Sequence, residues 1–157
     1  MDAATPEEIA PLREGLRAFF AAFPFFKNMG FELVDVEPGR SVISATYRED
    51  LCQPAGVMHG GVIATLVDTG MAHAILLTEY NRQLHLSGGS IVSLDLRIKY
   101  FRPVSQGKIL AVSTAPRIGS RIVHTESIVT NEQGKEIAKA DAIFMGVSGM
   151  PVKVDRS

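Results

Sequence analysis

One stretch of the sequence combines residue types that can support catalysis. It reads Gln-Pro-Ala-Gly-Val-Met-His-Gly-Gly from Gln53 to Gly61 and leads into an apolar segment that carries Asp68. Gly60 and Gly61 stand where we expect a helix to begin. The first N–H groups of a helix lack partners and carry partial positive charge, so they can hold a developing oxyanion. Glycine also lets a ligand approach the backbone closely. A plain tight turn is the alternative for the two glycines, and a hydrogen-bonded residue at the helix entry is the alternative for His59.

Asp68 is an isolated carboxylate in an otherwise apolar helical segment. Burying it without compensation costs several kcal/mol, so it needs a partner or a chemical task. A structural bond to a neighbouring loop or subunit is the alternative. Asp68-Thr69-Gly70 also resembles the motif of aspartic proteases, and a dimer would supply the second aspartate. That motif lies on a turn after a strand, whereas an alanine-rich helical run surrounds it here, so a protease is the least favoured interpretation.

The composition is that of one globular domain. The 157 residues are 46% hydrophobic and 21% charged, which is enough for a core. The net charge of −1 lacks the basic excess that nucleic-acid binding requires. The single cysteine, Cys52, excludes a disulfide within the chain and favours a cytoplasmic protein, and the acidic start lacks the basic beginning of a secretory signal. Asp68 and His73 interrupt the longest apolar segment, so we expect no membrane partner.

The predicted elements are a helix, two strands, a long helix and four strands. The first helix begins at Thr5-Pro6 and is ended or kinked by Pro24. The long helix covers Gly60–Leu77, and the polar segment Glu79–Ser90, with its glycine pair, is predicted to be a mobile loop. The strands are predicted at Phe31–Val36, Ser41–Tyr47, Ile91–Phe101, Lys108–Ala115, Arg121–Thr130 and Glu136–Val147. In the third strand, alternation puts one set of residues on a single face: Val92, Leu94, Leu96, Ile98 and Tyr100.

These elements indicate an α+β fold in which one antiparallel sheet wraps around the long helix, with an extra N-terminal helix. A helix that has almost no polar face must be covered on nearly all sides, and a curled sheet can do this. The outer face and the edges of the sheet then need cover, which favours a homodimer or homotetramer.

Several motifs together carry a resemblance to a known family. They are Gln-x5-His-Gly-Gly with Asp68 eight residues after the first glycine, Met29-Gly30-Phe31, Leu66-Val67-Asp68, Val92-Ser93-Leu94-Asp95 and Tyr100-x-x-Pro103. The chain resembles the hotdog-fold acyl-CoA thioesterases, in particular the PaaI-like branch and the second type of 4-hydroxybenzoyl-CoA thioesterase. The resemblance covers Phe25 to Gly146. It implies a single hotdog thioesterase domain over residues 1–157, with a helical extension over residues 1–28 and a tail over residues 148–157.

The resemblance also implies a role for the motif residues. The Gly60 N–H polarises the thioester carbonyl, and Asp68 acts as nucleophile or as general base on water. Gln53 positions the thioester or the water, Ser93 assists the water, and His59 joins the catalytic set through its motif. The site lies between two subunits, with Gly60 and Gln53 from one chain and Asp68 from the other. Because PaaI-like members carry Asn at the position of Gln53 and the other branch carries Glu at that of Asp68, both branches stay open.

The function implied is hydrolysis of an aryl- or medium-chain acyl-CoA to the free acid and CoA, without a cofactor. The alternative is a hotdog protein that binds acyl-CoA without turnover, as a sensor or carrier. The candidates for binding the CoA phosphates are Arg117, Ser120 and Arg121 at a predicted turn, with Arg97 and Lys99 as further choices and a solvated surface as the alternative. Five phenylalanines offer an acyl pocket, although core packing is favoured for them: Phe19, Phe20, Phe23, Phe25 and Phe26. The four histidines show no zinc-ligand spacing, so no metal site is predicted.

Overall fold

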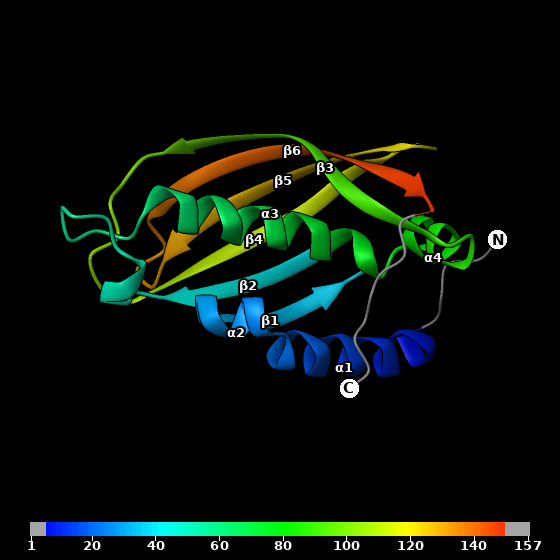
Figure 1. Ribbon diagram of the computed structural model, residues 1–157, viewed down its shortest axis with the longest axis horizontal. Helices are drawn as coiled ribbons and strands as arrows, with labels where there is room; N and C mark the ends of the chain where they lie inside the picture. Colours follow the sequence, from blue (N-terminus) through cyan, green and yellow to red (C-terminus); the bar gives the residue numbers. More distant parts are fainter. Residues whose placement is uncertain (1–5, 150–157) are drawn as a thin grey trace.

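The apolar segment after His59 forms the central helix of the protein. In the computed structural model, which describes residues 6–149, helix α3 spans Gly60–Leu76. Its apolar side chains are buried on several sides: Val62, Ile63, Leu66, Val67, Met71, Ala74 and Ile75. Figure 1 shows α3 lying along one face of a curved sheet, which supplies the cover that such a helix requires.

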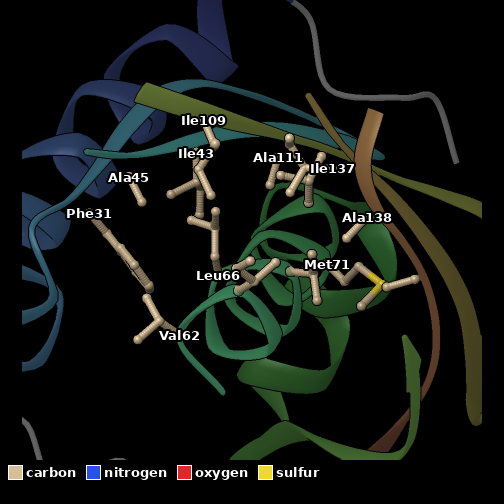
Figure 2. Close-up of a cluster of buried hydrophobic side chains, with 14 of the residues drawn as sticks. Phe31, Ile43, Ala45, Val62, Leu66, Met71, Ile109, Ala111, Ile137 and Ala138 are labelled. Carbon is tan, nitrogen blue, oxygen red and sulfur yellow. The ribbon is translucent and has the colours of Figure 1, made fainter. Parts of the chain in front are cut away.

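Six antiparallel strands form this sheet, so the predicted α+β arrangement is confirmed. The strands are β1 (Phe31–Glu37), β2 (Arg40–Thr46), β3 (Gly89–Tyr100), β4 (Lys108–Ile118), β5 (Ile122–Asn131) and β6 (Glu136–Ser148). Their order across the sheet is β1-β2-β4-β5-β6-β3, which leaves β1 and β3 at the edges. Inward side chains of the sheet, among them Ile43, Ile109 and Ala111, meet Leu66 and Met71 of α3 (Figure 2).

A row of small residues lets α3 approach the sheet closely at Gly70. Ser41, Ser113 and Ser127 lie opposite one another on β2, β4 and β5, and all three are buried. The Ser41 hydroxyl donates to the Gly70 carbonyl at 2.7 Å, and a Cβ at Gly70 would lie 2.5 Å from the Ser113 Oγ. The close packing of α3 against the sheet therefore explains why residue 70 is a glycine. Because Asp68 to Gly70 are helical, they lack the turn on which the aspartic-protease motif depends.

Two helices precede the sheet. α1 spans Pro6–Ala22 and α2 spans Pro24–Met29, so Pro24 ends the first helix, as predicted, and also begins the second. The predicted cap Thr5 lies outside the described residues. At the other end of the chain, Ser148 belongs to β6 rather than to a tail, and the rest of the expected tail after Gly149 also lies outside them.

The prediction of a mobile loop at Glu79–Ser90 is wrong for most of that segment. Glu79–Leu86 forms helix α4, which Thr78 caps by accepting a hydrogen bond from the Asn81 N–H at 3.3 Å. The Glu79 carboxylate accepts hydrogen bonds from Arg82 at 2.7 Å and from Gln83 at 2.6 Å. These local bonds support a short, mostly polar helix that buries none of its residues, and only Tyr80 and Leu84, four residues apart, face the sheet. Two apolar positions within eight residues are a weak signal for predicting a helix from sequence.

No single helix within residues 6–149 is long and apolar enough to cross a membrane. Taken together, α3 and α4 have the length and composition of a membrane span, but the pair is bent by 81° at its junction.

Candidate active site

His59 and two glycines build the N-terminus of α3. The Nδ1 atom of His59 accepts a hydrogen bond from the Gly61 N–H at 2.9 Å, so His59 is the N-cap of the helix. Gly61 must lack a side chain, because a Cβ there would lie 2.9 Å from the same nitrogen. The contact that the structure shows for His59 is therefore that of a capping residue.

Gly60 is the first residue of α3 and presents an unused donor. Its N–H donates to no acceptor within residues 6–149. Its φ angle is not positive, so its conformation does not require glycine and the tight-turn explanation does not hold. An unpaired N–H at a helix N-terminus is the group that an oxyanion site needs.

Asp68 has the partner that its position in an apolar helix demands. Its half-buried carboxylate accepts a hydrogen bond from the Ser93 hydroxyl, with 2.8 Å between Oδ1 and Oγ. Ser93 lies on the edge strand β3, so this bond joins the central helix to the edge of the sheet. A carboxylate next to a hydroxyl can hold a water molecule and accept its proton.

A β-bulge in β3 turns Ser93 toward α3, and the predicted strict alternation of this strand is wrong. Ser93 lies opposite Phe144, whereas Asp95 lies opposite Ile143, so Leu94 is the extra residue. Opposite residues share a face, and Phe144 belongs to the core, so Ser93 faces the helix. Leu94 is 52% exposed, while Leu96 packs against the core.

The loop between β2 and α3 carries Gln53 in a tight turn after a short 3-10 helix, Glu49–Leu51. The Gln53 N–H donates to the Val57 carbonyl at 2.9 Å, and the Tyr47 hydroxyl donates to the Gly56 carbonyl at 3.1 Å. The Gln53 side chain is exposed and makes no hydrogen bond to the described part of the chain. Its predicted role in positioning the thioester therefore stays a prediction.

Gly60 and Asp68 are too far apart along α3 to act on the same carbonyl group within one chain. They are separated by eight residues of regular helix, which corresponds to about 12 Å at 1.5 Å per residue. The unpaired N–H of the first residue points out of the N-terminus of the helix, so the Gly60 N–H is directed away from Asp68. Gly60 and the pair of Asp68 and Ser93 are thus two separate candidate half-sites within one chain.

A family model described as the thioesterase superfamily matches residues 55–138, a segment that includes Gly60, Asp68 and Ser93. The chain belongs to this superfamily. Acyl-coenzyme A thioesterase 13 of Homo sapiens is 31% identical over 131 residues, which cover 82% of this chain and 89% of the human protein. Together with the family match, this similarity identifies the protein as a thioester hydrolase.

Solved structures share its fold. A variant of the phenylacetic acid degradation protein PaaI from Thermus thermophilus is 26% identical, with a TM-score of 0.67, over 78% of this chain and 97% of that one. A thioesterase from Haemophilus influenzae, at 21% identity, has a TM-score of 0.71 over 97% of this chain and 96% of that one. The thioesterase therefore has the expected hotdog fold, and its similarity to PaaI agrees with the PaaI-like branch.

The candidate CoA-binding residues of the thioesterase do not lie together: two are at a turn and the others are on strands. Ser120 and Arg121 lie at the turn between β4 and β5 and line a cavity of about 610 Å³ next to α4 and the end of β6. Arg117 was expected at this turn but lies inside β4, opposite His124, because a bulge between Thr114 and Arg117 accommodates the proline that was expected to end the strand. The two further choices lie on β3, where Arg97 pairs with Asp141 and Lys99 is exposed.

The phenylalanines divide into core and surface residues. Phe20 is buried and stacks on Phe26 at 4.1 Å between ring centroids, as core packing predicts. Both rings meet His73 edge-on, at 5.1 and 5.6 Å. Phe19, Phe23 and Phe25 are 41 to 47% exposed.

His73 is the buried titratable group of α3. Its Nδ1–H donates to the Thr69 carbonyl at 2.7 Å, and burial lowers the pKa of His73 below its ordinary value. This histidine is therefore a neutral part of the aromatic cluster. Within residues 6–149, no group of three or more His, Cys, Asp or Glu side chains is placed to hold a metal ion.

Tyr100 makes a contact near the site that was not predicted from the sequence. The Tyr100 hydroxyl donates to the Gly60 carbonyl at 2.8 Å, across 40 residues of sequence. The Tyr-x-x-Pro motif was the one sequence signal that pointed to Tyr100. The spacing of this motif does not show which atom the Tyr100 hydroxyl contacts.

Proposed function

We propose that this thioesterase hydrolyses aryl- or medium-chain acyl-CoA thioesters to the free acid and CoA, in the cytoplasm. The observation that carries the proposal is the hydrogen bond between Asp68 and Ser93, because a carboxylate and a hydroxyl at this distance are able to bind and orient one water molecule together. Similarity to a human acyl-coenzyme A thioesterase and to a phenylacetic acid degradation protein supports this choice of substrate.

In the proposed reaction, the thioester oxygen accepts a hydrogen bond from the Gly60 N–H. Asp68 accepts a proton from a water molecule that Ser93 helps to orient, and the water oxygen attacks the carbonyl carbon. The negative charge that forms on the thioester oxygen is stabilised by the helix N-terminus. Cleavage of the carbon–sulfur bond then releases the CoA thiolate, which takes up a proton. Alternatively, Asp68 attacks the carbonyl itself, and water hydrolyses the resulting anhydride.

The proposed site is shared between two copies of the chain. The separation of about 12 Å between Gly60 and Asp68 along α3 supports an arrangement in which the donor comes from one copy and the carboxylate from the other. We assign Gly60 and Gln53 to one chain, and Asp68 and Ser93 to its partner, in a homodimer or homotetramer. The edge position of β3, which carries Ser93, is consistent with a second copy covering that side of the sheet.

Ser120 and Arg121 are the proposed contacts for the CoA phosphates. They line a common cavity, and a guanidinium group binds phosphate oxygens through two parallel hydrogen bonds. Arg117, which lies within β4, is the third proposed phosphate contact. His59 stays a proposed member of the catalytic set, beside its observed contact as the cap of α3.

The proposal is tested by following the release of free thiol from a panel of aryl-, short-, medium- and long-chain acyl-CoAs. We expect turnover to depend on the acyl group and to fall by about 100-fold or more in Asp68→Asn, which keeps the shape of the side chain but removes its basicity. If acyl-CoA binds to the wild-type protein in calorimetry but no thiol is released, the non-catalytic alternative is correct. Near-wild-type turnover in a folded Asp68→Asn protein would contradict the assigned role of Asp68.

A further inference from the structure

Tyr100 connects the edge strand β3 to the proposed oxyanion donor. Its hydroxyl donates to the Gly60 carbonyl at 2.8 Å, and its ring lies 3.4 Å from the point where a Cβ of Gly60 would be. The same strand carries Ser93, which holds Asp68. One edge strand therefore contacts α3 at both half-sites.

The absence of a side chain at Gly60 creates a need for such a contact. Glycine permits close approach of the substrate, but it also leaves φ and ψ less restricted than any other residue. As the first residue of α3, Gly60 has no acceptor for its own N–H within residues 6–149, so this bond does not hold it. Other contacts must fix the direction of that N–H.

The two peptide groups that flank Gly60 are both held by hydrogen bonds. In the first, the His59 carbonyl accepts from the Val62 N–H at 2.9 Å. In the second, the Gly61 N–H donates to the His59 Nδ1 at 2.9 Å, and the Gly60 carbonyl, which as the first carbonyl of α3 also accepts within the helix, accepts from Tyr100. Tyr100 is therefore the long-range contact among these bonds, and the others lie within four residues of one another.

We infer that Tyr100 is a positioning residue for the oxyanion donor: by holding the Gly60 carbonyl, it keeps the Gly60 N–H directed at the thioester oxygen. This inference rests on the proposed function. Donors stabilise a transition state most effectively when their direction is fixed before the reaction. Burial raises the pKa of Tyr100, so its hydroxyl stays protonated and donates throughout the neutral range.

The test compares Tyr100→Phe with the wild-type protein. Phenylalanine keeps the ring that packs on Gly60 and removes only the hydroxyl, so the variant is expected to fold. We expect kcat to fall by about 10-fold, as for the loss of one aligned hydrogen bond, and KM to stay within about twofold, because the substrate contacts remain. Amide hydrogen exchange at Gly61, followed by NMR, is expected to become faster in the variant, since its peptide group loses the one hydrogen bond that ties it to β3.

Tyr80→Phe is the matched control for stability. Tyr80 also donates its hydroxyl to a backbone carbonyl, that of Arg121, at 3.1 Å, so it reports the change in Tm when such a bond is lost elsewhere. A decrease in Tm for Tyr100→Phe that far exceeds this control, together with equal changes in kcat and KM, would indicate a purely structural role and overturn the inference.

Two further outcomes separate the inference from the proposed function. If wild-type protein releases thiol from acyl-CoA and Tyr100→Phe has an unchanged kcat, the positioning role is wrong while the proposed function stands. If the wild-type protein releases no thiol from any acyl-CoA, both are overturned.

Discussion

The separation of Gly60 and Asp68 along α3 predicts that two differently damaged chains restore one another. Gly60→Val places a side chain beside the proposed donor, and Asp68→Asn removes the proposed base. Each change alone is expected to lower turnover by about 100-fold or more. In a dimer of one chain of each kind, one site receives both changes, and the other receives an unchanged Gly60 and an unchanged Asp68. Mixed dimers are therefore expected to have about half of the wild-type turnover, and a random mixture about one quarter.

The assay uses co-expression of the two variants with different affinity tags, so that sequential purification isolates mixed assemblies for measurement of thiol release. Gly60→Val is expected to fold, because φ at Gly60 is not positive, a Cβ there lies 3.4 Å from Tyr100, and the exposed Tyr100 ring can shift outward to admit the two methyl groups. Mixed assemblies of two Asp68→Asn chains with the same tags are the control. Folded mixed dimers that are no more active than either variant alone would refute the shared site and the argument from helix length.

Three further predictions concern residues whose contacts the structure defines. Ser93→Ala is expected to lower kcat by about 10-fold with little change in Tm, and an unchanged kcat in thiol release would remove Ser93 from the site. Because burial lowers the pKa of His73 in the folded state, protonation favours unfolding, so stability is constant above the ordinary histidine pKa and is lost as the pH falls below it. His73→Phe is expected to show a smaller difference in Tm between about pH 5 and 7.5 than the wild-type protein, and an equal difference would contradict this origin. Gly70→Ala is expected to destabilise the fold by about 1–3 kcal/mol, because the new Cβ meets the Ser113 Oγ. Adding Ser113→Ala is expected to recover part of that loss in chemical denaturation, whereas purely additive effects would contradict this contact.

The fold could be predicted well where apolar patterns are strong. Gly60–Leu77 was predicted from its length and its alanine, leucine and methionine content, and α3 ends one residue earlier, at Leu76. All six strands were also predicted, from short apolar or alternating segments that turn residues separate. α4 was missed, because the segment is mostly polar and its apolar face consists of only Tyr80 and Leu84, while the Thr78 cap and bonds between neighbouring side chains add to its stability.

The candidate site could be predicted only in part. The motif located Gly60 and Asp68, and the isolation of Asp68 indicated that it has a partner. The family resemblance gave Ser93 only as a residue that assists the water, and strict alternation put it on the face opposite Leu96; its bond to Asp68 came from the structure. A bulge leaves no mark in composition, and it becomes visible only when two strands are paired. The contact of Tyr100 with Gly60 likewise depends on tertiary packing.

The bulge at Leu94 makes the site sensitive to the number of residues as well as to their identity. Side chains alternate with a period of two, so the extra residue decides which side of the sheet the preceding residues face. Deletion of Leu94 would leave every candidate catalytic residue in the chain and yet turn the Ser93 hydroxyl away from Asp68. In this part of β3, the loss of one residue is thus equivalent to replacing the serine.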